Sequence, residues 1–256
     1  MVFRIGSWNV LHMIHEINNV FDNSLVMEEY KITTDTKNET NRLLDIYKFV
    51  VDKLDGNNII CLQEVPGDLY NLLNTKLSDH HVINYKYPRF PKIKKPNIID
   101  PYKINFEYLV TIIPKKICSK LIGSCVVQFD DLGKAALITN INDLIIINTH
   151  MPFGTPRTKA LSNISQYLSE AKYDSYIIVG DTNMTKEEFV DELKNTSLCG
   201  YLVGFNGDTY KIKTESGILT KQIDHMLISN NIKTTNPIVE KTLMSDHNMI
   251  SVDIHI

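Results

Sequence analysis

Residues 176–183 read YIIVGDTN, in which four apolar residues are followed directly by a glycine and three polar residues. A short apolar run bounded by a glycine is typical of a buried β-strand. A glycine at this point favours close approach of a neighbouring backbone, and Asp181 and Asn183 follow it side by side. Because α/β enzymes hold reactive side chains at the ends of their strands, this stretch predicts an α/β fold with its chemistry at one edge of a sheet.

Five further apolar runs also end in polar residues and predict strands, at residues 2–10, 58–63, 144–147, 222–229 and 249–256. Helical periodicity falls between them, at residues 38–54, 68–77, 158–171 and 185–194. Thr185 and Glu188 form a capping-box pattern at the start of the last helix. No repeat or Gly/Ser-rich linker divides the chain, so we predict one domain over residues 1–256.

Composition and charge exclude several classes of protein. A hydrophobic content of 43% in 256 residues is enough to bury a core, which excludes a disordered chain. The 27 basic and 30 acidic residues give a net charge of -3, which excludes a protein held on nucleic acid by its overall charge.

A local basic segment at residues 86–96, KYPRFPKIKKP, fits either a surface that follows a nucleic-acid strand or a solvated loop. No apolar run reaches about 18 residues and no signal peptide is recognisable, so we expect an intracellular protein with no membrane partner.

The polar residues at the predicted strand ends form six short motifs in chain order. They are WN at residues 8–9, LQE at 62–64, NTH at 148–150, GDTN at 180–183, ID at 223–224 and SDH at 245–247. This ordered set resembles the endonuclease/exonuclease/phosphatase superfamily of metal-dependent phosphodiesterases, and residues 62–65 (LQEV) and 180–183 (GDTN) most resemble its tyrosyl-DNA phosphodiesterase 2 group. The resemblance implies a four-layer α/β sandwich, in which two packed mixed β-sheets are flanked by helices.

Three of these motif residues have the chemistry of ligands for a hard divalent cation. Asn9, Glu64 and Asp246 offer oxygen atoms, which suit Mg²⁺ or Mn²⁺, and the lack of an accompanying cysteine argues against zinc. A bound cation of this kind would stabilise the charge that develops on a phosphoryl group. The resemblance assigns Glu64 as the main ligand, with Asn9 and Asp246 contributing, and predicts Mg²⁺ as the cofactor, with Mn²⁺ as the alternative.

Five further residues receive catalytic roles from the same resemblance. Asp224 would pair with His247, orient its ring and favour the imidazolium form, which can contact a phosphate. Asp181 would orient or deprotonate the attacking water. Asn183 and His150 would donate hydrogen bonds to the phosphoryl oxygens as charge develops.

Four more polar residues have roles that their positions leave open. Asn148 and Arg157 are the candidate substrate-binding residues. Asn148 shares a strand face with His150 and would support it from behind, whereas Arg157 could either bind a phosphate with two hydrogen bonds or cap the following helix. His12 and His15 have no carboxylate at metal-ligand spacing, so we expect both on the surface or in loops.

The function predicted from these residues is Mg²⁺-dependent hydrolysis of a phosphodiester in nucleic acid, or in a 5′ adduct of nucleic acid, by a monomer. One alternative is a phosphoesterase that acts on a small molecule or a lipid headgroup, because the same catalytic residues would serve both and only the loops would differ. A second alternative, from another class, is a binding module that has the fold but no activity. The presence of all six residues Glu64, Asp181, Asn183, Asp224, Asp246 and His247 favours the enzyme.

Overall fold

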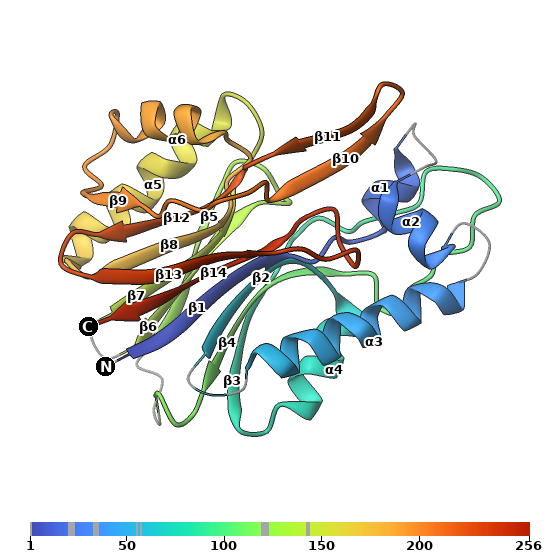
Figure 1. Ribbon diagram of the computed structural model, residues 1–256, viewed down its shortest axis with the longest axis horizontal. Helices are drawn as coiled ribbons and strands as arrows, with labels where there is room; N and C mark the ends of the chain where they lie inside the picture. The colour runs from blue at the N-terminus through green and yellow to red at the C-terminus, as the bar shows by residue number, and fades with distance from the viewer. Residues whose placement is uncertain are drawn as a thin grey trace.

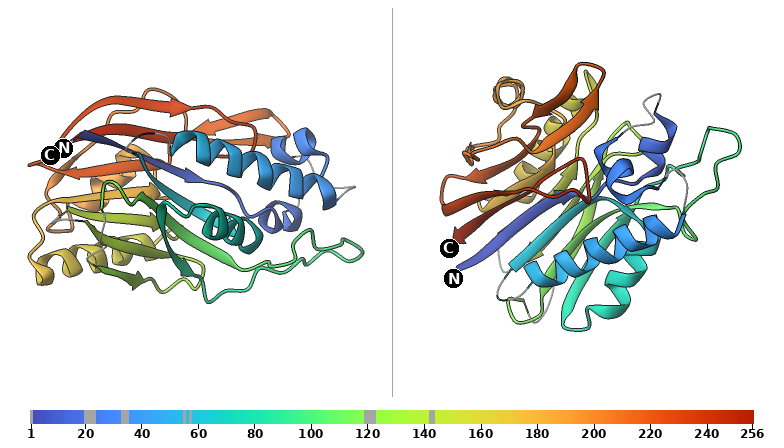
Figure 2. Two further views of the ribbon diagram at one scale, coloured as in Figure 1. Left: turned by 90° about the horizontal axis from the view of Figure 1, so that it is seen from below. Right: turned by 45° about the vertical axis from the view of Figure 1, so that its right-hand side comes forward.

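The computed structural model describes residues 2–19, 24–32, 36–54, 56, 58–118, 123–141 and 144–256. Two six-stranded mixed sheets pack face to face, and helices cover the outer face of each sheet (Figure 1). Figure 2 shows the same arrangement from two further directions, with α3 and α4 on one side of the pair of sheets and α5 and α6 on the other. The layers run helix, sheet, sheet, helix, which confirms the predicted α/β sandwich.

The first sheet has the strand order β13-β14-β1-β2-β4-β3. Its strands are β1 (Val2–Asn9), β2 (Asn58–Pro66), β3 (His80–Lys86), β4 (Glu107–Pro114), β13 (Lys233–Glu240) and β14 (Met249–His255). Strands β1 and β2 are parallel, and the other pairs are antiparallel. The helices that pack on its outer face are α1 (Ile14–Asn18), α2 (Leu25–Tyr30), α3 (Thr36–Lys53) and α4 (Gly67–Lys76).

The second sheet has the strand order β5-β6-β7-β8-β12-β9. Its strands are β5 (Gly123–Gln128), β6 (Ala135–Ile141), β7 (Leu144–His150), β8 (Tyr176–Asp181), β9 (Gly200–Leu202) and β12 (Asp224–Ser229). Here β7 and β8 are the parallel pair. Its outer face is covered by α5 (Pro156–Ala171) and α6 (Lys186–Leu193), and the predicted capping box of Thr185 and Glu188 opens α6.

The alternation of side chains along each strand sorts the core into layers. In β1, Phe3 and Ile5 pack between the two sheets, whereas Trp8 packs on the helix side. In β7, Ile146 packs between the sheets, whereas Ile147 faces the outer helices. Strands that are buried on both faces need apolar residues on both, which explains why their sequences are continuous apolar runs.

The two parallel pairs bring the ends of four strands to one end of the sandwich. In the second sheet, His150 at the end of β7 pairs in register with Asp181 at the end of β8, and Asp224 of β12 lies opposite Asp181. In the first sheet, β1 and β2 end together at Asn9 and Gln63. A hairpin of β10 (Tyr210–Thr214) and β11 (Gly217–Lys221) extends beyond this end, as do α1 and α2 (Figure 1). Among the described residues, no helix combines the length and the apolar character needed to cross a membrane.

Candidate active site

The strand ends surround a cleft with a volume of about 570 Å³, which is within the range of small-molecule and active-site pockets. Its lining includes most of the residues predicted from the motifs, namely Glu64, His150, Asp181, Asn183, Asp246, His247 and Arg157. Asn9 and Asp224 lie directly behind them and contact them through hydrogen bonds. The structure therefore brings together residues from both sheets that are far apart in the sequence.

Three residues at the edge of this cleft have unusual backbone conformations. Gly180 has a φ of 147°, and a Cβ atom there would lie 1.9 Å from the carbonyl oxygen of Thr149, so the predicted close backbone approach is confirmed. Asn183 and Glu64 have φ values of 54° and 53°, a region that non-glycine residues rarely occupy. Regular alternation would put Glu64 on the helix side with Leu62, but the register shift between β2 and β4 turns Glu64 toward the cleft.

Asp181 lies at the centre of the cleft residues. Its Oδ2 atom accepts a hydrogen bond of 3.1 Å from the side-chain amide of Asn9 and lies 3.4 Å from Nε2 of His150 and 3.7 Å from Nε2 of His247. Its Oδ1 atom accepts a hydrogen bond of 2.9 Å from the backbone N–H of Asn183. Burial would raise the pKa of Asp181, but the nearby His247 and His150 outweigh burial and hold this pKa below its usual value, so Asp181 is a carboxylate.

His247 is held as a cation by the carboxylates around it. Its Nδ1 atom lies 2.9 Å from Oδ2 of Asp224, the pairing that the resemblance implied. Burial lowers the pKa of His247, but Asp224, Asp246 and Asp181 together raise the pKa from 6.5 to about 10. The other ring nitrogen, Nε2, faces the cleft on the side of Asp181 and is the atom that can donate a hydrogen bond to a bound anion.

Of the predicted metal ligands, Asn9 is buried, whereas the carboxylates of Glu64 and Asp246 are partly exposed and line the cleft. The side-chain amide of Asn9 donates to Oε1 of Glu64 at 3.2 Å, and Ser245 donates its hydroxyl to the backbone carbonyl of Asn9 at 2.7 Å. Burial, with Glu64 and Asp181 nearby, raises the pKa of Asp246 from 3.8 to about 6. Carboxylates that are buried close together repel one another unless a cation joins them, so this donor set fits a hard divalent cation.

Lys134 is a cleft residue that the sequence prediction does not include. It follows Gly133 in the turn before β6, its residue is 7% exposed, and its ammonium contacts the ring of His150. The positive charge of Lys134 also contributes to lowering the pKa values of Glu64 and Asp181. The chain contains 27 basic residues, almost all of them lysine, so composition alone does not single out Lys134.

Asn148, the candidate substrate-binding residue that was expected to support His150 from behind, lies outside the lining of the cleft. Its side chain is fully buried between the sheets, where it donates to the backbone carbonyls of Val110 and Leu62 and accepts a hydrogen bond of 2.8 Å from Gln63. Because these bonds use both ends of its amide, Asn148 joins β7 to β2 and β4 in place of touching substrate. The prediction that it shares a strand face with His150 is confirmed.

Arg157 lines the cleft but is held by two carboxylates of α6. Its Nη2 atom donates to Oε1 of Glu188 at 2.9 Å, and its Nε atom lies 3.6 Å from Glu192. Arg157 thus pairs with side chains of α6, and its contact with a substrate phosphate stays a prediction. The other three arginines are paired as well, Arg4 with Asp253, Arg42 with Glu39 and Arg89 with Glu107.

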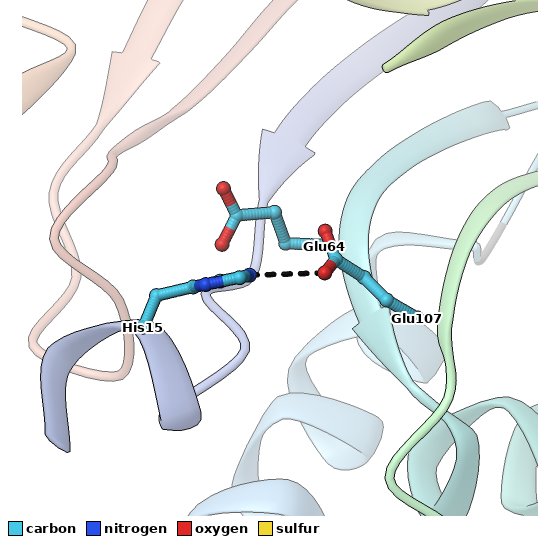
Figure 3. Close-up of side chains that lie close together, drawn as sticks. All are labelled: His15, Glu64 and Glu107. Carbon is cyan, nitrogen blue, oxygen red and sulfur yellow. Dashed lines mark hydrogen bonds and ion pairs between the residues drawn. The ribbon is translucent and has the colours of Figure 1, made fainter. Parts of the chain in front are cut away.

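A histidine and two glutamates meet beside the predicted metal ligands, as Figure 3 shows for His15, Glu64 and Glu107. His15 comes from α1, Glu64 from β2 and Glu107 from the start of β4. His12 is fully buried and donates from Nε2 to the backbone carbonyl of Asn105, 3.1 Å away. The prediction of a surface or loop position holds for His12 only in that it lies in the loop before α1, and it is wrong for His15, which lies in α1 and pairs with Glu107. Their partners are some 90 residues away in the sequence, which is why spacing within the N-terminal segment did not indicate them.

Comparisons with known proteins agree with this architecture. No family model matches the sequence, and no curated protein matches it. Among solved structures, TDP2 from D. rerio in complex with a single-strand DNA product has a TM-score of 0.65 and 15% identity, over 100% of this chain and 99% of that chain. An endonuclease/exonuclease/phosphatase from Bacteroides vulgatus has a TM-score of 0.67 and 16% identity, over 100% and 99%. The mannosyl-6-phosphatase Bt3783 of Bacteroides thetaiotaomicron has a TM-score of 0.65 and 13% identity, over 99% and 100%.

These similarities cover 99% to 100% of the chain, so they include all six strand-end motifs. At identities of 13% to 16%, these similarities establish the fold alone. The substrate has to be inferred from the residues of the cleft. The chain has the fold of the endonuclease/exonuclease/phosphatase proteins, including TDP2.

Proposed function

We propose that this chain is a divalent-metal-dependent hydrolase of phosphoester bonds and that its substrate is a phosphodiester in nucleic acid or in a 5′ adduct of nucleic acid. The observation that supports this proposal most directly is the arrangement around Asp181. A buried carboxylate there faces two histidine rings, and one of them, His247, is held as an imidazolium by Asp224. This pairing of an anionic base with a cationic donor is what in-line attack of water on a phosphate requires.

The side chains then have separate roles in the reaction. Asp181, which is ionised, orients the attacking water and accepts its proton. His247 donates from Nε2 to a phosphoryl oxygen, and Asp224 fixes the ring so that Nε2 faces the cleft. The side-chain amide of Asn183 already donates to the carbonyl of Met151 at 2.7 Å, which holds it in place while its second N–H can reach the phosphate.

Asn9, Glu64 and Asp246 are the residues that would hold the cation. A cation bound there would neutralise charge on the phosphate and on the departing oxygen. The oxygen donors favour Mg²⁺, and Mn²⁺ is the alternative.

Two observations favour nucleic acid as the substrate class. One is the structural similarity to D. rerio TDP2, which is described in complex with a single-strand DNA product. The other is the segment at residues 86–96, where Arg89 lines the cleft and the ammonium of Lys92 lies 5.7 Å from the ring centre of Phe90. Basic and aromatic side chains next to one another suit a strand of stacked bases.

A sugar phosphate is the second candidate substrate, because a mannosyl-6-phosphatase matches this fold with the same TM-score as D. rerio TDP2. The cleft also contains the acidic residues Glu16 and Asp131, which could accept hydrogen bonds from sugar hydroxyls. Phosphoesters of lipid headgroups are a further class of candidate substrate, which soluble inositol phosphates represent in the experiment below.

A substrate panel tests the proposal. Labelled single- and double-stranded DNA and RNA, a 5′-phosphotyrosyl DNA end, mannose 6-phosphate and soluble inositol phosphates would each be incubated with the protein and Mg²⁺. We expect cleavage of a nucleic-acid substrate and a loss of about 10²- to 10⁴-fold in kcat for Asp181→Asn. Asp45→Asn, at an exposed position of α3, is the matched control and should retain full activity. Full activity of Asp181→Asn on the best substrate would contradict the catalytic assignment, and cleavage of sugar or inositol phosphates alone would contradict the nucleic-acid substrate.

A further inference from the structure

The cluster of His15, Glu64 and Glu107 is a second group of potential metal ligands beside the first. Each side chain offers one atom, and the three atoms lie within 4.8 Å of one another. Nε2 of His15 and Oε2 of Glu107 are 2.9 Å apart. Figure 3 shows the three side chains converging from separate elements.

These separations match the spacing of ligands around one ion. In an octahedral site with bonds of about 2.1 Å, neighbouring ligand atoms are about 3.0 Å apart and opposite ones about 4.2 Å apart. The distance between His15 and Glu107 corresponds to a neighbouring pair, and the outer limit of 4.8 Å allows Glu64 to close toward the ion by a small movement. Glu64 and His15 both have room to move, because their side chains are 13% and 30% exposed, whereas Glu107 is fully buried.

An unpartnered atom at the cluster independently indicates a ligand. The Glu107 side chain is fully buried, and its Oε1 atom has no hydrogen-bond partner among the described residues, although Oε2 is paired with His15. A buried carboxylate oxygen without a partner costs free energy unless a ligand binds it. Asp224 also has an oxygen without a described partner, but of the three side chains in this cluster only Glu107 has one, so Glu107 has unused capacity for a cation.

We propose that His15, Glu64 and Glu107 form a second divalent-cation site that shares Glu64 with the site of Asn9 and Asp246. The imidazole nitrogen distinguishes the two sites chemically. An all-oxygen set suits Mg²⁺, whereas one imidazole with two carboxylates suits a transition metal such as Mn²⁺. Because Glu64 is common to both, two bound ions would lie close together, as in two-metal phosphoesterases. The second site goes beyond the proposed function, which needs one cation. Only the statement that the two sites share Glu64 rests on the proposed function.

Arg89 is compatible with this site. Its guanidinium lies 3.5 Å from Glu107 and 3.3 Å from Nε2 of His15, so it partly neutralises Glu107 in the metal-free protein. The Arg89 side chain is 40% exposed and lines the cleft, so it can turn toward the cleft when a cation takes its place. Binding of the ion would then free one arginine for a substrate phosphate.

Mn²⁺ itself is the probe for the experiment, with the full chain and no substrate. Equilibrium binding followed by electron paramagnetic resonance would count the bound ions, and electron–nuclear double resonance would detect nitrogen bound to Mn²⁺. We expect two Mn²⁺ ions per wild-type chain and a histidine nitrogen coupling. His15→Gln keeps a hydrogen-bonding group for Glu107 but should lose the coupling attributable to His15 and weaken the second ion at least about tenfold. Asp246→Asn should weaken the other ion and keep the coupling.

The outcomes separate this site from the proposed function. One Mn²⁺ ion per wild-type chain, bound equally by His15→Gln, would overturn the second site and leave the proposed hydrolase in place. Two ions with a nitrogen coupling that His15→Gln does not alter would overturn it as well. Two ions with the His15 coupling, together with no activity on any phosphoester of the panel, would support the site and contradict the proposed function. Glu107→Gln, checked for folding by circular dichroism, should repeat the loss seen with His15→Gln.

Discussion

Lys134 balances the charge of the carboxylates that face the cleft. Its residue is only 7% exposed, and its ammonium contacts His150, while Phe153 packs near it with its ring centre 5.6 Å away. All four arginines are held in ion pairs with carboxylates. Lys134 is therefore a second cation, besides His247, that can meet an anionic substrate near Asp181.

Replacing Lys134 by methionine tests this role. Lys134→Met keeps the length of the side chain and removes its charge, so we expect kcat/KM to fall by about 10- to 100-fold through loss of a charge-assisted hydrogen bond to the phosphate. Lys159→Met is the matched control, because Lys159 is 65% exposed and pairs only with the exposed Asp130. Equal kcat/KM values for Lys134→Met and wild type would contradict the role.

The pairing of His247 with Asp224 predicts a pH dependence of stability. Folding raises the pKa of His247 from 6.5 to about 10, so its contribution to the free energy of unfolding is complete below pH 6.5 and is lost as the pH rises through about 10. In EDTA, the difference in unfolding free energy between wild type and His247→Gln should therefore shrink between pH 6.5 and pH 10. Urea unfolding of both proteins at several pH values measures it. A difference that stays constant over this range would show that the histidine is not charged in the folded protein.

The positions of side chains within the motifs could be predicted from the sequence. Contacts between side chains that are far apart in the sequence could not. Asp181 stands at the end of one apolar run and His247 just before the start of another, so their positions at strand ends follow from local sequence. His15 and Glu107 are 92 residues apart and meet only because α1 packs beside β4. Local spacing carries no information about such a contact, which depends on the path of the whole first sheet.

At the level of elements, strands that are buried on both faces were predictable. The runs that became β1, β2, β7, β8, β12 and β14 were predicted within a few residues, as were α3 to α6. The strands β5 and β13 are largely exposed and lack a continuous apolar run, so periodicity does not reveal them. The prediction also omits β4, although its segment YLVTII is fully buried and carries the same pattern as the others.

The contact between β7 and β8 makes Gly180 a sensitive position. A methyl group there would overlap the carbonyl of Thr149, and the φ of 147° is unfavourable for any L-residue. Gly180→Ala should lower the free energy of unfolding by more than about 3 kcal/mol, as measured by urea denaturation. Gly123→Ala, where no atom of the described residues lies within 4 Å of the added methyl, should change it by less than about 0.5 kcal/mol. Similar stabilities of the two variants would mean that the strands can separate to admit the methyl group.

For the whole molecule, a cation that binds only the folded chain must stabilise it. At a Mg²⁺ concentration about 100 times Kd, the gain is about 2.7 kcal/mol, which corresponds to a rise in Tm of about 5–10 °C for a chain of this size. Thermal unfolding in Mg²⁺ and in EDTA measures this shift. Glu64→Gln should reduce it strongly, since Glu64 belongs to the proposed ligand sets. Identical Tm values in Mg²⁺ and EDTA would favour the inactive binding module over the enzyme.

The order of the strands in the first sheet determines how late the cleft can form during synthesis of the chain. Trp8 donates its indole N–H to the backbone carbonyl of His247, 239 residues later, and β1 lies between β2 and β14. At about 5–20 residues per second, roughly 12–48 s separate the translation of these two residues. Once Glu64 has been added, and for the rest of that interval, a nascent chain holds Asn9 and Glu64 but neither Asp246 nor His247. The cleft of the proposed hydrolase is therefore incomplete until nearly all of the described chain has been synthesised.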